Sequence, residues 1–299
     1  MQTARKLSSA ATAEPLVPGE FSLSRDDFRR IASMIHEEAG IFLPETKAAL
    51  VYARLAKRLR ALQLDAFRDY CALVEGPDGV AERREMLAAL TTNVTRFFRE
   101  PHHFEHLRTR VLSPLMQEAQ RGGGRIRIWS AACSTGQEPY SVALTILSLS
   151  PDAARHNVRI LATDIDPYVL ETGKAGVYSE SQIEGVPPDQ RKRFFEAVSV
   201  DGKPHWRVCE AMRALVAFRP LNLIEPWPMR GEFNAIFCRN VVIYFDEPTQ
   251  QRIWENFVPR MTLGGALYIG HSERVAGPAA NVLSSDGIST YRLQEGSRR

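Results

Sequence analysis

Apolar residues recur at helical spacing through the first quarter of the chain. Phe28, Ile31 and Ile35 are separated by three and four residues, so they fall on one face of an α-helix. Ser24 stands directly before this pattern and acids follow it, which is typical of a helix N-terminus. Gly40 is expected to end the helix. The breaks in the pattern predict three further helices, beginning near residue 44, after residue 65 and after residue 79.

After the three glycines at 122–124, runs of strand length alternate with helical stretches. Residues 125–129 alternate as a β-strand does, residues 136–150 have helical spacing, and residues 158–162 form another apolar run. This alternation predicts a mainly parallel sheet with helices packed on it. Later strand candidates are residues 215–218, 235–238, 266–270 and 289–293.

The change of pattern divides the chain into a small helical domain, residues 21–92, and a larger α/β domain, residues 93–299. Residues 1–20 are small and polar and include two prolines, so a disordered tail is expected there. In residues 198–208, apolar positions alternate on either side of Asp201-Gly202, which is a hairpin signal.

Composition narrows the class of protein. The 299 residues are 44% hydrophobic, enough for a substantial core, and no apolar run approaches the roughly 18 residues of a membrane helix. With no secretory signal pattern, a cytoplasmic location and no membrane insertion are expected. The four cysteines form no C-x-x-C pair, which argues against disulfides and structural zinc. A net charge of +3 is too small to indicate nucleic-acid binding.

The basic residues are unevenly distributed. Residues 46–63 carry five basic side chains and no acid, and a helical wheel places Lys47, Arg54 and Arg58 on one side, next to an apolar stripe. Such a stripe is either a solvated face or a surface that lies along an acidic partner helix.

Polar residues follow the predicted strands where a ligand is expected to bind in an open α/β sheet. The turn at 130–136 consists of small residues beside a helix N-terminus, which suits close approach to a ligand but is not G-x-G-x-x-G. Asp164 ends the next strand, where an acid accepts hydrogen bonds from a ribose diol; the alternative for Asp164 is a helix N-cap, a role better suited to Asp166. Arg239 and Asn240 emerge from the strand at 233–238.

Six motifs make the chain resemble the CheR family of chemoreceptor glutamate methyltransferases. They occur in the expected order over residues 22–293, at 92–100, 131–141, 162–166, 222–223, 238–246 and 270–273. The resemblance implies a class I methyltransferase fold, with a Rossmann-like mainly parallel sheet, an N-terminal all-helical domain and a small β-hairpin subdomain at about 196–218. It implies S-adenosyl-L-methionine as cofactor and S-adenosyl-L-homocysteine as product.

The resemblance also assigns roles to residues. Arg99 and Tyr244 are expected nearest the transferring methyl group as catalytic residues. The expected cofactor-binding residues are Asn93, Thr95, Arg99, Glu138, Asp164, Asn222, Leu223, Arg239 and Asn240. The helical methylation region of a receptor is expected to dock on Lys47, Arg54, Lys57 and Arg58. In some relatives the hairpin captures the receptor's C-terminal tail by strand addition; for this chain a hairpin without a partner is the alternative.

The chemistry needs no general base, because a glutamate carboxylate with a pKa near 4.3 is already ionised at neutral pH. His102 and His106 have the spacing of a metal pair, but no completing ligand is apparent and no metal is expected; Cys133 lacks a partner base. The alternatives are methylation of another acceptor, such as RNA or a small molecule, and a non-catalytic adaptor that binds the cofactor or its product. The receptor, its modified glutamates and the oligomeric state are not determined by the sequence.

Overall fold

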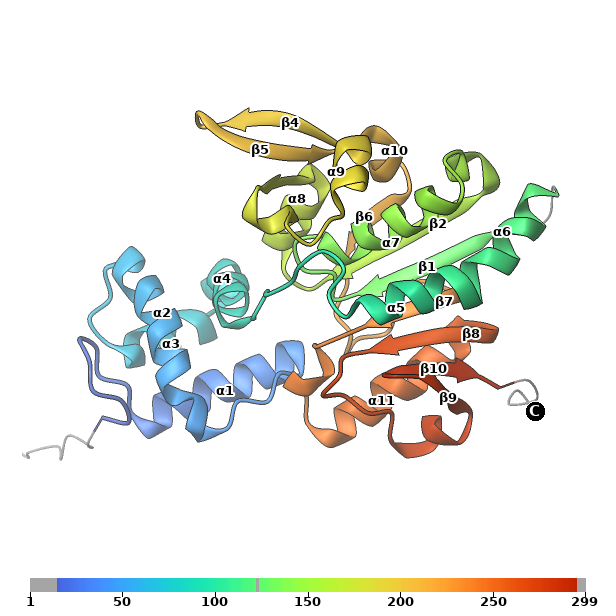
Figure 1. Ribbon diagram of the computed structural model, residues 1–299. Helices are drawn as coiled ribbons and strands as arrows, with labels where there is room; N and C mark the ends of the chain where they lie inside the picture. The colour runs from blue at the N-terminus through green and yellow to red at the C-terminus, as the bar shows by residue number, and fades with distance from the viewer. Residues whose placement is uncertain (1–14, 122–123, 295–299) are drawn as a thin grey trace, which may run out of the picture. The chain divides into compact units, whose positions relative to one another are not determined.

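The computed structural model describes residues 15–121 and 124–294, which divide into two compact units between residues 90 and 91, with residues 39–41 belonging to the second (Figure 1). Residues 1–14 of the predicted tail lie outside the described residues. The rest of that tail makes contacts in the first unit, where Val17 forms a β-bridge with Leu23 and Glu20 pairs with Arg60 at 2.7 Å. Within the described residues, no helix combines the length and apolar character needed to cross a bilayer.

The first unit is helical, as predicted. Ser24 and Asp27 cap its first helix reciprocally: Asp27 N donates to Ser24 Oγ, and Asp27 Oδ2 accepts from Ser24 N, both at 3.1 Å. Ile31 and Ile35 are fully buried, which confirms the apolar face. The elements are α1 (Arg25–Ala39), η1 (Glu45–Lys47), α2 (Ala48–Leu62), α3 (Phe67–Glu75), η2 (Pro77–Gly79) and α4 (Val80–Leu90).

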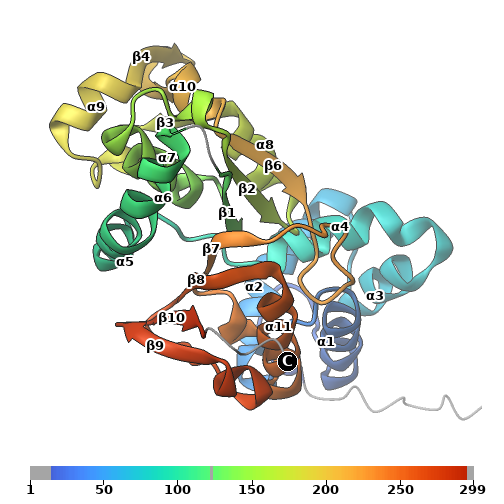
Figure 2. The ribbon, with the colours of Figure 1, turned by 90° about the vertical axis from the view of Figure 1, so that its right-hand side faces the viewer.

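The second unit contains a seven-stranded, mainly parallel sheet (Figure 2). In sheet order the strands are β6 (Val216–Pro220), β2 (Val158–Asp164), β1 (Ile126–Ala131), β7 (Phe233–Cys238), β8 (Met261–Ile269), β10 (Thr290–Leu293) and β9 (Leu283–Gly287). The strands from β6 to β8 are parallel neighbours, whereas β10 is antiparallel to β8 and β9.

Helices follow most strands of this sheet. Because Pro and acids favour a helix start, α8 begins at Pro167 with Asp166 as its N-cap. The longer helices are α7 (Gln137–Leu149), α8 (Pro167–Ala175) and α11 (Glu247–Phe257). The shorter ones are α5 (Pro101–His106), the π-helical segment η3 (Leu107–Leu112), α6 (Ser113–Gln120), η4 (Ala153–His156), η5 (Ser181–Ile183), α9 (Pro188–Phe194), α10 (Glu210–Arg213), η6 (Val242–Tyr244), η7 (Val258–Arg260) and η8 (Gly277–Asn281).

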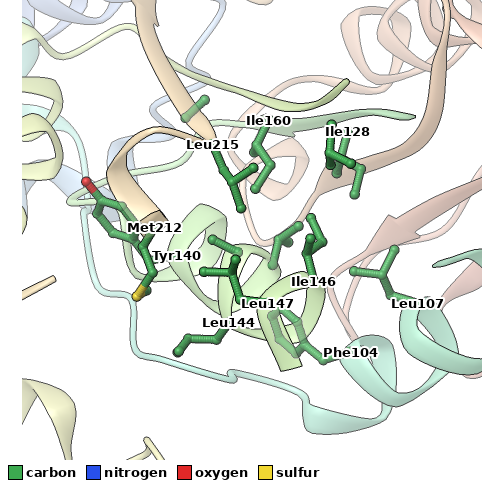
Figure 3. Close-up of a cluster of buried hydrophobic side chains, with 14 of the residues drawn as sticks. Phe104, Leu107, Ile128, Tyr140, Leu144, Ile146, Leu147, Ile160, Met212 and Leu215 are labelled. Carbon is green, nitrogen blue, oxygen red and sulfur yellow. The ribbon is translucent and has the colours of Figure 1, made fainter. Parts of the chain in front are cut away.

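Both faces of the sheet are buried. Successive side chains of β1 point to opposite faces, so neighbouring residues of this strand pack in different clusters. Ile128 packs in one cluster with Ile160 and with Leu144 and Leu147 of α7 (Figure 3). Trp129, the next residue, packs in a second cluster that includes Trp254 and Phe257 of α11. The strand β1 therefore contributes side chains to two cores.

The predicted hairpin is present in a separate antiparallel sheet, ordered β3 (Val177–Ser179), β5 (Lys203–Val208) and β4 (Phe195–Val200). Its turn residues Asp201 and Gly202 both have positive φ, 49° and 74°, as a type I′ turn requires. The predicted subdomain limits of 196–218 need correction. Residues 216–218 belong to β6, because they pair with β2 in the main sheet, and the third strand of the small sheet comes from residues 177–179.

Candidate active site

The parallel register brings two of the predicted site residues, Asp164 and Arg239, to one edge of the sheet. Ala131 of β1 is level with Thr163 of β2 and with Cys238 of β7. The next residues along β2 and β7 are Asp164 and Arg239, so both emerge beside the turn that follows β1. Chain order reverses between β1 and β7, which makes this edge the topological switch point where α/β sheets bind ligands.

The turn after β1 is held by Asp164. Ser134, which has a positive φ of 50°, donates from its backbone N to Asp164 Oδ2 at 2.8 Å, and Asp166 N donates to Oδ1 at 3.0 Å. Asp166 itself caps α8 through Tyr168 N at 2.9 Å, so the helix-cap alternative belongs to Asp166. Burial raises the pKa of Asp164 to about 6. Each Asp164 oxygen retains a lone pair that can accept from a ligand.

The turn also requires glycine at one position. Gly136 has φ of 95° directly before α7, and an added Cβ there would lie 2.9 Å from Tyr178 Oη and 3.0 Å from Gly173 Cα. The backbone of this turn therefore lies too close to Tyr178 and Gly173 for any side chain at position 136. Cys133 in this turn is buried, and desolvation raises the pKa of its thiol well above the usual value, so it suits packing and not nucleophilic attack.

Arg239 lies between two carboxylates. Its Nη1 donates to Glu138 Oε2 at 3.0 Å, and its Nη2 is 3.2 Å from Glu100 Oε2, with the Arg239 side chain only 2% exposed. Ser130 Oγ donates to the other oxygen of Glu138 at 2.7 Å. Burial raises the pKa of Glu138. Burial also opposes ionisation of Glu100, but Arg239 and neighbouring histidines outweigh it, so the pKa of Glu100 lies below its usual value.

The loop before α5 joins this edge at both of its ends. Asn93 Nδ2 donates to Asp166 Oδ2 at 3.0 Å, and its carbonyl accepts from Ser134 Oγ at 2.9 Å. At the other end, the carbonyl of Arg99 accepts a hydrogen bond from Arg239. The Arg99 guanidinium donates from Nη1 to the Val94 carbonyl at 2.9 Å. Thr95, which follows Val94 in the sequence, is half-buried.

The remaining predicted residues lie on loops after β6 and β7. Asn222 donates to Glu225 Oε1 at 3.0 Å and accepts from Ile224 N at 3.3 Å, and Leu223 is buried. Asn240 has φ of 57°, and its Oδ1 is buried without a hydrogen-bond partner among the described residues. Tyr244 ends η6 and is half-buried.

The contacts thus form two groups, one around Asp164 with Asn93, and one around Arg239 with Glu138 and Arg99. Among the described residues, no hydrogen bond joins Leu223 or Tyr244 to these groups. The sequence reasoning missed Glu100, whose only signal was its place directly after Arg99 in the motif 92–100. It also missed Ser130 and Ser134, which are small residues of the turn.

The histidines near Glu100 differ from the pair considered in the sequence. The possible ligand atoms of Glu100, His102 and His103 lie within 4.8 Å of one another, whereas His106 bonds to Tyr268 Oη and Asp286 Oδ2, both at 3.0 Å. Because Glu100 is already paired with Arg239, a metal cation there would meet a guanidinium and not an uncompensated carboxylate. We therefore assign no metal to this group.

The four predicted docking residues divide into two kinds. Arg54 donates to the Leu90 carbonyl at 2.6 Å, and Arg58 binds Glu82 at 2.9 and 2.6 Å, so both are occupied inside the unit. Lys47 and Lys57 are exposed. Acids from α4 thus account for part of the charge excess that appeared uncompensated within residues 46–63.

Comparison with known proteins identifies the family. A family model described as the CheR methyltransferase SAM binding domain matches residues 93–289, and one described as the CheR methyltransferase all-alpha domain matches residues 26–91. A probable chemotaxis protein methyltransferase of Rhizobium etli is 58% identical over 259 residues, 87% of this chain and 96% of that protein. Chemotaxis protein methyltransferase 2 of Pseudomonas aeruginosa is 41% identical over 277 residues, 91% of this chain and 94% of that protein. The chain therefore belongs to the CheR methyltransferase family, and its α/β unit is the family's S-adenosylmethionine-binding domain.

Proposed function

We propose that this protein is a chemotaxis methyltransferase that esterifies glutamate side chains of chemoreceptors in the cytoplasm. The observation that carries the proposal is the buried edge where Arg239 joins Glu138 and the Arg99 carbonyl, beside Asp164 at the end of β2. The family's two domains and the motif order support it.

The side chains at this edge fit S-adenosylmethionine. Within the part of the chain that the structure describes, Asn240 Oδ1 is a buried acceptor without a hydrogen-bond partner, and a bound ligand with a donor group supplies one. Glu138 presents negative charge for the amino-acid portion, and Asp164 presents acceptors for the ribose hydroxyls, with Asn222 and Leu223 bordering the adenine. Asn93, Thr95 and Arg239 complete the set. When bound, the cofactor supplies a methyl group on a positively charged sulfur.

The chain's own task is positioning, because the acceptor carboxylate is ionised without a base. Arg99 holds that carboxylate through its guanidinium, an attraction of about 4 kcal/mol at 4 Å and an effective dielectric of 20. Esterification removes the negative charge, so this attraction weakens in the product and favours its release. Tyr244 borders the reacting carbon and helps to exclude water.

The receptor's methylation helices are the proposed partner of the helical unit. Lys47 and Lys57 are the exposed cations of the predicted docking set and suit an acidic helix. Arg54 and Arg58 support this surface from inside the unit. The β4–β5 hairpin is the proposed site for a receptor's tail, since an edge strand can accept a further strand.

The test uses radiolabelled S-adenosylmethionine and receptor cytoplasmic fragments with and without their last few residues. We expect label that base releases as methanol, and Arg99→Ala should lower the transfer rate by roughly tenfold or more. Arg96→Ala is the matched control, because Arg96 is an exposed arginine of the same loop. Label lost only on tail removal supports capture by the hairpin. Cofactor binding without base-labile label on any receptor fragment contradicts the proposal.

A further inference from the structure

The segment Gly270–Glu273, which follows β8, contributes no residue to the predicted cofactor-binding set. Its last residue is half-buried, and its carboxylate faces the turn that follows β7. Glu273 Oε2 accepts from Asn240 N at 2.9 Å, and Oε1 accepts from Val241 N at 2.9 Å and Val242 N at 2.8 Å. One carboxylate therefore holds three successive backbone N–H groups.

These N–H groups converge because Asn240 adopts a left-handed conformation, with φ of 57°. A turn of this kind forms a concave set of donors that attracts an anion. Glu273 supplies that anion from within the chain, and its Oε2 also accepts from Gly270 N at 2.5 Å. The carboxylate thus ties the end of β7 to the end of β8.

Gly270 approaches the same turn from the other side. An added Cβ at this position would lie 2.4 Å from Asn240 Nδ2 and 2.8 Å from Asn240 N, so a larger residue displaces Asn240. His271 continues the contact towards Arg239, since its Nδ1 is 3.2 Å from Glu100 Oε1. The segment therefore supports both polar residues that follow β7.

We propose that Glu273 is a positioning residue for methyl transfer, which fixes the turn 240–242 and through it Asn240 and Tyr244. Tyr244 is linked to the held turn, because its N donates to the Val241 carbonyl at 3.1 Å. This inference rests on the proposed function, since Glu273 acts through residues assigned to the cofactor and the methyl group.

Glu273→Gln tests the inference with little change of size. A glutamine side chain has one acceptor oxygen, and its NH2 group faces N–H donors that it cannot satisfy. We expect faster amide hydrogen exchange at residues 240–242 while β7 stays protected. We also expect the Kd for S-adenosylhomocysteine to rise and kcat to fall, each by roughly tenfold, the scale of one lost hydrogen bond to a charged group. Glu255→Gln, on the exposed side of α11, is the matched control.

Gly270→Ala displaces the same turn without removing charge. It tests whether the position of the turn 240–242 matters for methyl transfer, even if Glu273→Gln fails to fold. It should reproduce the kinetic defect, and it should also lower the melting temperature, because the added Cβ would lie 2.8 Å from the backbone N of Asn240. Unchanged exchange at 240–242, or Kd and kcat within about twofold of the unaltered protein in both variants, overturns the inference. If the unaltered protein methylates no receptor fragment, the proposed function has failed, whereas the exchange and Kd measurements still decide the role of Glu273.

Discussion

Glu138 and Arg239 are 101 residues apart in the sequence, and their side chains meet at 3.0 Å between Oε2 and Nη1. The parallel pairing of β1 with β7 explains the meeting, because Glu138 lies in the first turn of the helix after β1 and Arg239 follows β7 directly. Arg239 is shared with Glu100, so one buried guanidinium pairs with two carboxyl groups.

Glu138→Gln should separate cofactor binding from stability. The amide can accept from Arg239 and donate to Ser130 Oγ, and burial already opposes ionisation of Glu138, so the free energy of unfolding should change by less than about 1 kcal/mol. The lost negative charge should weaken S-adenosylhomocysteine binding by roughly tenfold. Urea unfolding and calorimetry measure the two effects.

Glu138→Ala is the contrasting variant, because it leaves Arg239 Nη1 and Ser130 Oγ without this partner. We expect it to lower the free energy of unfolding by about 3 kcal/mol. Equal stability losses in the Gln and Ala variants would mean that charge, and not hydrogen bonding, is what Glu138 contributes to the fold.

Tyr244→Phe should lower kcat while leaving the cofactor Kd nearly unchanged. Among the described residues the Tyr244 hydroxyl makes no hydrogen bond, so its removal should cost little stability. If the hydroxyl orients groups around the methyl in the transition state, its loss should reduce kcat by roughly tenfold to a hundredfold. Single-turnover methylation of a receptor fragment measures the chemical step. A kcat equal to that of the unaltered protein removes Tyr244 from the catalytic residues.

The parallel strands could be predicted because their sequences are short and mostly apolar, and because residues 125–129 alternate as a strand does. The edge strand β9 (Leu283–Gly287) was not predicted, because Ser284, Ser285 and Asp286 lack that pattern. The strand β3 was missed because it has only three residues. Local pattern identifies strands whose own side chains form the core, and it fails where pairing with a neighbour decides the conformation.

The site residues could be placed at the ends of strands, but their partners could not be read from the sequence. Asp164 follows from the position of β2, whereas its bond to Ser134 N depends on the register of β1 against β2. Arg58 shows the same limit. A helical wheel of α2 displays its charge but not Glu82, which α4 supplies from 24 residues away.

Because His103 is buried, the free energy of unfolding should decrease in mild acid. The His103 side chain is fully buried, and burial lowers its pKa to about 3. Between that value and the ordinary histidine pKa near 6.5, the unfolded chain binds a proton that the folded protein does not. The free energy of unfolding therefore falls as pH drops below about 6.5, by up to about 1.4 kcal/mol per pH unit.

Urea unfolding from pH 7 to pH 4 tests this with His103→Gln, which can still donate to the Ile288 carbonyl that His103 Nε2 contacts at 3.1 Å. The pH dependence of the variant should be shallower than that of the unaltered protein. His102→Gln, at an exposed neighbouring position, should leave the slope unchanged. Identical slopes in all three proteins would show that His103 is protonated equally in both states.

Lys57 and Arg58 are adjacent in α2 but should respond differently to substitution. Arg58→Ala removes the partner of Glu82, which is largely buried and also accepts from Tyr70 Oη at 3.0 Å, so the free energy of unfolding should fall by about 3 kcal/mol. Lys57 is exposed, so Lys57→Glu should leave stability unchanged.

If the exposed cations of α2 meet acidic receptor helices, Lys57→Glu should raise the KM for a receptor fragment roughly fivefold. The increase should shrink at high salt because screening weakens the attraction. Arg252→Glu, an exposed charge reversal on α11, is the control for a general charge effect. A receptor KM that Lys57→Glu leaves unchanged at low salt places the docking surface elsewhere on the protein.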